Sequence, residues 1–325
     1  MNLLEVDDLH VDLRTGDTMA PVLRGVSLRV SAGEAVGLVG ESGCGKSMTT
    51  RAVMNLLPRG ATTTGRVRFE GSDILAAERA VVRASRQRIG IVFQDPRAHI
   101  NPVRRIEDFI TEQARSQGHV RRMADRRALE LLEDVGIEDP RRCMTRYPHQ
   151  LSGGMLQRVM IAAALMVEPV LILADEPTTA LDVTTQSEVM AILDELRRER
   201  GVALLFISHD LDLAMAVCDR ISVMYAGQIV ETRAAALLHD DPLHPYTAGL
   251  ASARPSVAHT AGRLAAIPGR PLSALEAPEG CAFAPRCAHE KPACSEPQLL
   301  VALDEGEARC VRATELRGLL GSKRG

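Results

Sequence analysis

One short motif constrains the fold of this chain more than any other feature: the glycine-rich segment GESGCGKS at residues 40–47. It fits the phosphate-binding pattern G-x-x-x-x-G-K-[ST]. The apolar run Ala35–Val39 reads as a buried strand before it, and a helix is expected to begin at its end. Because strand, loop and helix follow in the order that the motif requires, the segment predicts a phosphate-binding loop.

The residue types in this loop match that chemistry. Glycines let backbone N–H groups approach phosphate oxygens, and the helix N-terminus adds partial positive charge. Lys46 is expected to reach the β- and γ-phosphates, and the Ser47 hydroxyl to ligate Mg²⁺. Cys44 lies beside Lys46 at a predicted helix N-terminus, conditions that lower the pKa of a thiol, and the alternative is a passive small residue in place of Ser. The residues expected to bind the nucleotide here are Gly40, Ser42, Gly43, Cys44, Gly45, Lys46, Ser47 and Met48.

Alternating strands and helices predict an α/β core with a mostly parallel sheet. Nearly unbroken apolar runs indicate further strands at Val170–Ala174, Ala203–Ile207 and Ile89–Phe93. A helix is expected at Thr184–Arg200, where apolar residues recur at helical spacing and Gly201 follows.

Flanking segments have different patterns. Alternating apolar and polar residues over Leu3–Val30 predict antiparallel strands. Helices alone are expected between Pro96 and Glu168, at Ile106–Gln117, Arg122–Val135 and Ser152–Val167. Prolines become frequent after about Thr232, which predicts a small loop-rich appendage.

Two carboxylates, Asp175 and Glu176, end the strand at Val170–Ala174. The carboxyl end of a strand near a phosphate-binding loop is a position for a second Mg²⁺ partner and a base. We expect Asp175 to serve the metal and Glu176 to polarise the attacking water. Acidic residues at strand ends are common, so this pair is weak evidence by itself.

Charge and hydropathy argue against a nucleic-acid-binding protein and against a membrane-spanning protein. The 325 residues carry 39 basic and 42 acidic side chains, a net charge of −3 that gives no electrostatic footprint for nucleic acid. The longest apolar run, Val159 to Val167, falls short of the ~18 residues that a bilayer span needs. No signal peptide is evident at the N-terminus. A cytoplasmic location is therefore expected, with any membrane association through a partner.

A second motif, Leu151-Ser152-Gly153-Gly154-Met155, lies before a long predicted helix and resembles the signature of the ABC ATPases. Other family motifs follow in the family's order: Gln94 for the Q-loop, Ala180-Leu181-Asp182 for the D-loop and His209 for the switch histidine. The resemblance covers residues 1–235 and implies an ABC ATPase domain with a helical subdomain at about 97–168.

The resemblance also implies roles. Ser152, Gly153 and Gly154 would complete the site of a second ATPase subunit, so that ATP is sandwiched between two chains, with Asp182 nearby. Glu176, His209 and Gln94 would be catalytic, and Ser47, Gln94 and Asp175 would hold Mg²⁺. One position departs from the family pattern, because Leu13 stands where an aromatic ring usually stacks on adenine.

The sequence of the C-terminal segment resembles that of oligopeptide and dipeptide importer ATPases. Their C-terminal extension is similar to His244-Pro245-Tyr246-Thr247 and to the segment GCAFAPRC at residues 280–287. Residues 236–325 would form this extension. The resemblance implies a peptide importer on the cytoplasmic face of the inner membrane, with two permease subunits, a second identical or paralogous ATPase and an external substrate-binding protein. Related importers carry nickel, opines or glutathione, so these cargoes stay open, as does a soluble, non-transport ABC ATPase or a metal-sensing module.

Four cysteines, Cys281, Cys287, Cys294 and Cys310, crowd the tail. Their gaps match neither a zinc ribbon nor a ferredoxin run, yet four thiolates can hold a [4Fe–4S] cluster or Zn²⁺. Some importer ATPases of this family carry an iron–sulfur cluster at such cysteines. We expect a structural cluster here, remote from the ATP site, with zinc and plain thiols as alternatives.

Overall fold

The computed structural model describes residues 2–179, 181–253 and 267–321, and these divide into two compact units. The first unit comprises residues 1–3, 30–34 and 76–207, and the second comprises residues 4–29, 35–75 and 208–325. No helix in the described part of the chain has the length and hydrophobicity needed to cross a bilayer.

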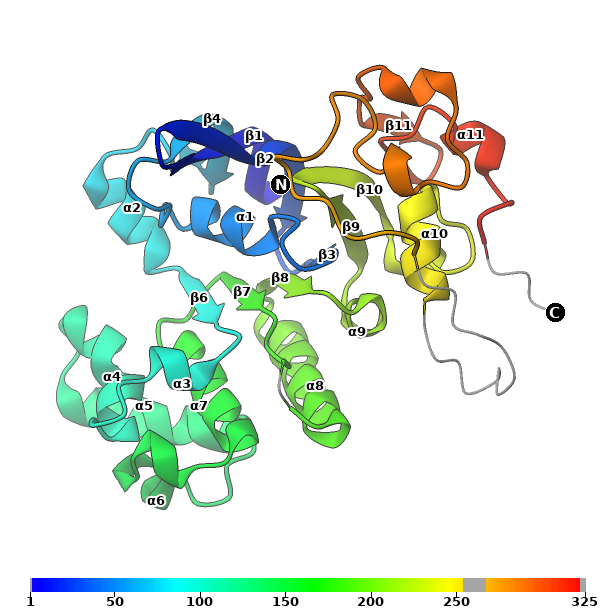
Figure 1. Ribbon diagram of the computed structural model, residues 1–325. Coiled ribbons are helices and arrows are strands. Elements are labelled where there is room, and N and C mark those ends of the chain that lie inside the picture. The colour runs from blue at the N-terminus through cyan, green and yellow to red at the C-terminus, as the bar shows by residue number, and fades with distance from the viewer. Residues whose placement is uncertain (1, 180, 254–266, 322–325) are drawn as a thin grey trace. The chain divides into compact units, whose positions relative to one another are not determined.

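The first unit contains three parallel strands and a group of helices (Figure 1). Its strands are β6 (Ile89–Val92), β7 (Leu171–Asp175) and β8 (Ala203–Ser208), with β7 in the middle. Its helices are α2 (Arg79–Arg86), α3 (Pro96–His99), α4 (Ile106–Ser116), α5 (Arg121–Asp134), α6 (Pro140–Thr145), the 3₁₀ turn η1 (Pro148–Gln150), α7 (Gly153–Leu165) and α8 (Val183–Arg200).

The helices of this unit begin and end where local chemistry allows. The Asp182 carboxylate accepts a hydrogen bond from the Thr185 N–H and caps α8, which ends at Gly201 with φ 64°. Between β6 and β7 the described chain is helical, as its apolar spacing predicts, and α4, α5 and α7 pack on one another. The helices and strands predicted here are confirmed to within a few residues.

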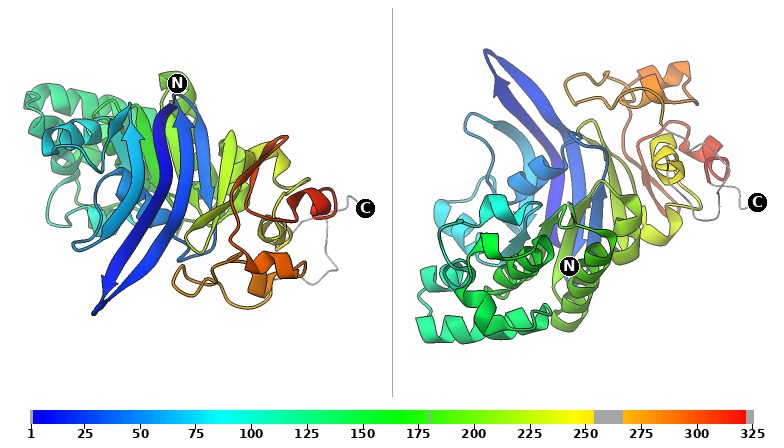
Figure 2. Two further views of the ribbon diagram at one scale, coloured as in Figure 1. Left: turned by 90° about the horizontal axis from the view of Figure 1, so that it is seen from above. Right: turned by 60° about the horizontal axis from the view of Figure 1, so that its bottom comes forward.

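The second unit holds two sheets, and Figure 2 shows the long N-terminal strands of one of them side by side. That sheet has the order β2-β1-β4-β5, from β1 (Asn2–Thr15), β2 (Thr18–Ser31), β4 (Thr62–Phe69) and β5 (Ser72–Asp73). In the other, β3 (Ala35–Val39) pairs in parallel with β9 (Arg220–Tyr225), which pairs antiparallel with β10 (Gln228–Ala234). The strands β9 and β10 were not predicted. Helices α1 (Lys46–Val53) and α9 (Leu211–Val217) belong to this unit, and α9 packs on β3 and β9.

The C-terminal extension continues the second sheet. Its strand β12 (Gly306–Ala308) pairs antiparallel with β10, and β11 (Val301–Leu303) pairs with β12. The rest is mostly irregular chain with five short helical elements in the described residues: η2 (Ala235–Leu237), α10 (Pro245–Ser252), η3 (Ala284–Arg286), η4 (Pro292–Ser295) and α11 (Ala313–Leu316). Its own core is small, centred on Leu243, Ala308 and Ala313.

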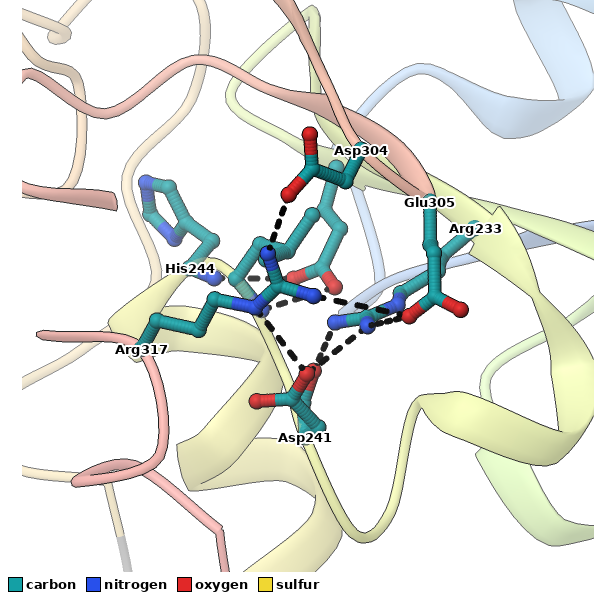
Figure 3. Close-up of polar contacts among 8 residues, drawn as sticks. Arg233, Asp241, His244, Asp304, Glu305 and Arg317 are labelled. Carbon is teal, nitrogen blue, oxygen red and sulfur yellow. Dashed lines mark hydrogen bonds and ion pairs between the residues drawn. The ribbon is translucent and has the colours of Figure 1, made fainter. Parts of the chain in front are cut away.

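A network of charges anchors this extension to β10 (Figure 3). Arg233, whose side chain is fully buried, pairs with Asp241 at 2.8 Å and with Glu305 at 3.2 Å. Arg317 adds ion pairs to Asp304 at 3.1 Å and to Asp241 at 3.5 Å. Because removing one partner would leave a buried charge uncompensated, the network fixes the extension against the sheet.

The same strand buries a carboxyl group. Glu231 is fully buried and accepts hydrogen bonds of 2.9 Å from the backbone N–H groups of Leu243 and His244. Burial raises the pKa of Glu231 from 4.5 to about 7, against the opposing effect of these hydrogen bonds. The folded chain therefore holds this proton more tightly than the unfolded chain does.

Stability should consequently depend on pH. The contribution of protonated Glu231 is complete below pH 4.5 and is lost as the pH rises through about 7. We expect the Glu231→Gln variant to lack this loss, which amounts to as much as ~3 kcal/mol of unfolding free energy. Urea unfolding at about pH 5 and about pH 8 measures the difference. Glu307→Gln, at an exposed position of β12, is the control and should keep the wild-type difference in unfolding free energy between the two pH values. The same difference in Glu231→Gln as in the wild type would refute the prediction.

Candidate functional site

The phosphate-binding loop lies between β3 and α1 in the second unit. A side chain at Gly40 would bring a Cβ to 2.1 Å from the carbonyl oxygen of Met224, and Gly45 has φ 114°, so both positions require glycine. Lys46 is buried, and its Nζ donates to the carbonyl oxygens of Gly40 at 2.7 Å and Glu41 at 3.1 Å. The ammonium group is thus held inside the loop that the sequence predicts to bind phosphate.

The remaining residues of the loop differ in exposure. Ser42, Gly43 and Ser47 are exposed, and Met48 is half-buried on the first turn of α1. Cys44 is buried, and burial raises the pKa of its thiol despite the opposing effect of Lys46. The expectation of a lowered thiol pKa was therefore wrong, because proximity to a cation was considered without desolvation.

In the first unit, Gln94 and Glu176 meet at the carboxyl ends of β6 and β7. The Gln94 Nε2 donates to the Glu176 carboxylate at 3.2 Å, and the Thr179 hydroxyl donates to the same oxygen at 3.1 Å. Asp175, half-buried, is the last residue of β7. Glu176 has φ 47°, a conformation that costs a non-glycine residue roughly 1–3 kcal/mol and is concentrated at functional sites.

The signature segment also lies in the first unit, at the start of α7. The Ser152 hydroxyl accepts a hydrogen bond of 3.3 Å from the Met155 N–H and caps the helix. A Cβ on Gly154 would approach Thr185 of α8 to 2.7 Å, so α7 and α8 touch here. Asp182 lies at the start of α8, and hydrogen bonds from Thr185 lower its pKa. The structure thus brings the signature segment close to Asp182.

Other predicted residues have separate positions. His209 is exposed and follows β8, and Leu13 is half-buried on β1. Both belong to the second unit. Ala180, the first residue of the D-loop motif, lies outside the described residues.

The four tail cysteines influence one another. Burial raises the pKa of the Cys310 thiol to about 11, and the neighbouring Cys281, Cys287 and Cys294 add to this effect. The backbone N–H of Cys281 donates to the Cys294 carbonyl at 2.8 Å. Within the described residues, however, no three His, Cys, Asp or Glu side chains are arranged to hold a metal ion. The iron–sulfur cluster and the zinc alternative therefore have no support from the side-chain positions.

Sequence reasoning missed one set of contacts to the phosphate-binding loop. Tyr246 and Arg286, both from the C-terminal extension, contact Glu41, the second residue of the loop. Arg286 directly precedes Cys287, one of the four tail cysteines. Tyr246 and Arg286 both belong to the segments that resemble the importer tail, so this resemblance was the one signal that could have drawn attention to them.

A phosphate-binding loop at the end of a parallel strand, strand-end carboxylates and a capped signature helix together define an ATPase of the ABC type. Residues 23–179 match the "ABC transporter" family, and residues 230–294 match "Oligopeptide/dipeptide transporter, C-terminal region".

Individual relatives agree with both matches. The oligopeptide transport ATP-binding protein OppD of Salmonella typhimurium is 40% identical over 316 residues, which cover 96% of this chain and 94% of the relative. OppD of Haemophilus influenzae is 38% identical over 309 residues, covering 94% and 96%. The solved dimer of the ATP-binding cassette MJ0796 with ADP and Pi is 28% identical, with a TM-score of 0.64, and the match covers 71% of this chain and 98% of that chain. The chain belongs to the ABC transporter ATP-binding proteins that carry the oligopeptide/dipeptide transporter C-terminal region.

Proposed function

We propose that this chain is the ATP-hydrolysing subunit of an ABC importer for dipeptides and oligopeptides. The observation that carries the proposal is the C-terminal extension. It matches the peptide-transporter region over residues 230–294, in a chain that is similar to OppD over 96% of its length. Its partners would be two permease subunits, a second identical or paralogous ATPase and, indirectly, an external substrate-binding protein. The chain would then lie on the cytoplasmic face of the inner membrane as a peripheral subunit.

The ATPase domain would comprise residues 1–235, with the helical subdomain at about 97–168, and the extension residues 236–325. Within the ATPase domain, Lys46 and the backbone of residues 40–48 would hold the phosphates of ATP. Leu13 would lie against the adenine in place of the usual aromatic ring.

The strand-end residues would carry out the hydrolysis. The Glu176 carboxylate would accept a hydrogen bond from the attacking water and so orient that water. The Gln94 amide and the Thr179 hydroxyl would hold the carboxylate in place. His209 would donate to the γ-phosphate. Ser47, Gln94 and Asp175 would supply the hydroxyl, amide and carboxylate oxygens that suit Mg²⁺. In the sheet, Val92 pairs with Ala174, two residues before Gln94 and one residue before Asp175. When bound, Mg²⁺ neutralises charge on the phosphates.

The signature segment would act on the nucleotide of the second ATPase. Ser152, Gly153 and Gly154 begin α7, and a helix N-terminus favours an anion. Support comes from the dimeric state of MJ0796, which was solved with ADP and Pi. Asp182 would lie beside this interface.

Reconstitution of the complete transporter in liposomes tests the cargo. ATP-dependent uptake of a labelled tripeptide that unlabelled peptides suppress would support the proposal. Uptake of nickel, an opine or glutathione in its place would reassign the cargo while keeping the importer. ATP hydrolysis without uptake of any of them would favour a non-transport ATPase.

We also propose that the tail thiols bind a [4Fe–4S] cluster, with Zn²⁺ as the alternative. Backbone N–H groups of Phe283 and Ala284 hydrogen-bond to Cys281, and the N–H of His289 donates to the Cys287 sulfur at 3.4 Å, but burial outweighs these contacts and raises the pKa of both free thiols. Such a centre would hold a tail that has little core of its own.

Metal analysis of anaerobically purified protein tests this proposal. About four irons per chain with absorption near 400 nm would support the cluster, and one zinc would support the alternative. Cys287→Ser should lower the metal content and make the tail sensitive to protease, while the ATPase domain still binds ATP. Metal-free protein with an ordered tail would contradict both.

A further inference from the structure

The C-terminal extension reaches the phosphate-binding loop through an ion pair. The Arg286 Nη1 lies 2.7 Å from one carboxylate oxygen of Glu41, and its Nη2 lies 3.2 Å from the other. The Arg286 side chain is only 4% exposed and that of Glu41 is 22% exposed. Because the contact is two-pronged and largely shielded from water, it restricts the position of Glu41 strongly.

Arg286 is itself held rigidly. Its Nε donates to the Pro268 carbonyl at 2.8 Å, and its Nη1 lies 3.3 Å from the Tyr225 hydroxyl. The guanidinium carbon lies 5.7 Å from the ring centre of Tyr225 and 5.8 Å from that of Phe283. Burial opposes the positive charge, but the hydrogen bonds to Glu41 and Tyr225 outweigh it and raise the pKa of Arg286. The guanidinium is therefore charged and pre-oriented.

A second contact holds the same residue of the loop. The backbone N–H of Glu41 donates to the Tyr246 hydroxyl at 3.0 Å. Tyr246 is fully buried, and its ring lies 4.7 Å from that of Tyr225 and 5.3 Å from that of Phe283. The carbonyl of Glu41, in turn, accepts from the Lys46 Nζ. Both the backbone and the side chain of Glu41 are thus fixed, next to the lysine expected to bind phosphate.

We propose that Arg286 is a positioning residue for nucleotide binding, which holds the start of the phosphate-binding loop through Glu41 and neutralises its carboxylate. The inference rests on the proposed function of the loop. Its physical basis is electrostatic as well as geometric, since an unpaired carboxylate in this loop repels the triphosphate that the loop must bind. A folded C-terminal extension is accordingly required for full nucleotide affinity.

Titration of the full-length chain with the fluorescent analogue mant-ATP tests the proposal. Arg286→Met keeps the apolar stem but removes the charge, and it should weaken mant-ATP binding about tenfold. Arg286→Lys keeps the positive charge but not the two-pronged guanidinium group. Its affinity for mant-ATP should lie between those of the wild type and Arg286→Met. The matched control is Arg270→Met, which breaks another Arg–Glu pair of the extension, that with Glu276, and should bind like the wild type.

The double variant Glu41→Gln with Arg286→Met separates the loss of charge neutralisation from a general loss of structure. Because a neutral glutamine no longer repels phosphate, the double variant should bind mant-ATP more tightly than Arg286→Met alone. Thermal unfolding of each variant checks that it is folded. Wild-type affinity in a folded Arg286→Met, or a double variant weaker than either single one, would overturn the inference. Wild-type protein that fails to bind mant-ATP would instead refute the proposed function, and the inference with it.

Discussion

The Glu176→Gln variant is expected to hydrolyse ATP roughly 10²–10⁴-fold more slowly than the wild type while binding ATP normally. The amide keeps the size and shape of the side chain, so the Thr179 hydroxyl can still donate to its oxygen as it does to the carboxylate at 3.1 Å. The negative charge that polarises the attacking water is lost. The φ of 47° at this position is backbone geometry that the substitution does not change.

Two measurements define the result. Phosphate release reports hydrolysis, and gel filtration with ATP and Mg²⁺ reports a dimer that accumulates because it cannot turn over. Glu188→Gln, which neutralises another carboxylate of the same unit that pairs with Arg158 at 2.8 Å, is the control and should retain full activity. Hydrolysis at the normal rate in Glu176→Gln would remove Glu176 from the mechanism.

The Ser152→Arg variant is expected to abolish ATP hydrolysis by the assembled transporter while the isolated chain still binds ATP. The long side chain would occupy the N-terminus of α7, where the phosphate of the partner's nucleotide is proposed to lie. Loss of the helix cap alone costs only about 1 kcal/mol, which is too little to unfold the domain. The loss of activity should therefore come from the blocked interface.

A cap elsewhere supplies the matched control. Asp139 caps α6 through a hydrogen bond of 3.0 Å from the Arg142 N–H, so Asp139→Arg removes a cap and adds the same side chain outside the signature segment. It should retain ATP hydrolysis in the assembled transporter. Equal activity of Ser152→Arg and wild type in the complex would contradict the two-chain site.

Local patterns predicted most of the core. The strands β3, β7 and β8 are buried along almost their full length, and such strands appear in sequence as unbroken apolar runs. By contrast, β10 contains Glu231 and Arg233, whose burial depends on partners contributed by later parts of the chain. A local sequence pattern does not predict a buried strand that contains charged residues of this kind.

The candidate site likewise has local features that the sequence could predict and tertiary features that it could not. The motif at residues 40–47 and the capped start of α7 are local, so their residues could be identified from sequence. The pair between Glu41 and Arg286 joins residues 245 positions apart, and the pKa of Cys44 depends on burial by the folded chain. Both are tertiary effects, which explains why one was missed and the other was assigned the wrong direction.

The pairing of β12 with β10 bears on where this chain can be cut. A chain that stopped after β10 would present an unpaired strand edge, and the polar side chains of Glu231 and Arg233 would lose their partners. Exposed edges of this kind recruit strands from other molecules, so such a truncation would favour aggregation over a working minimal cassette.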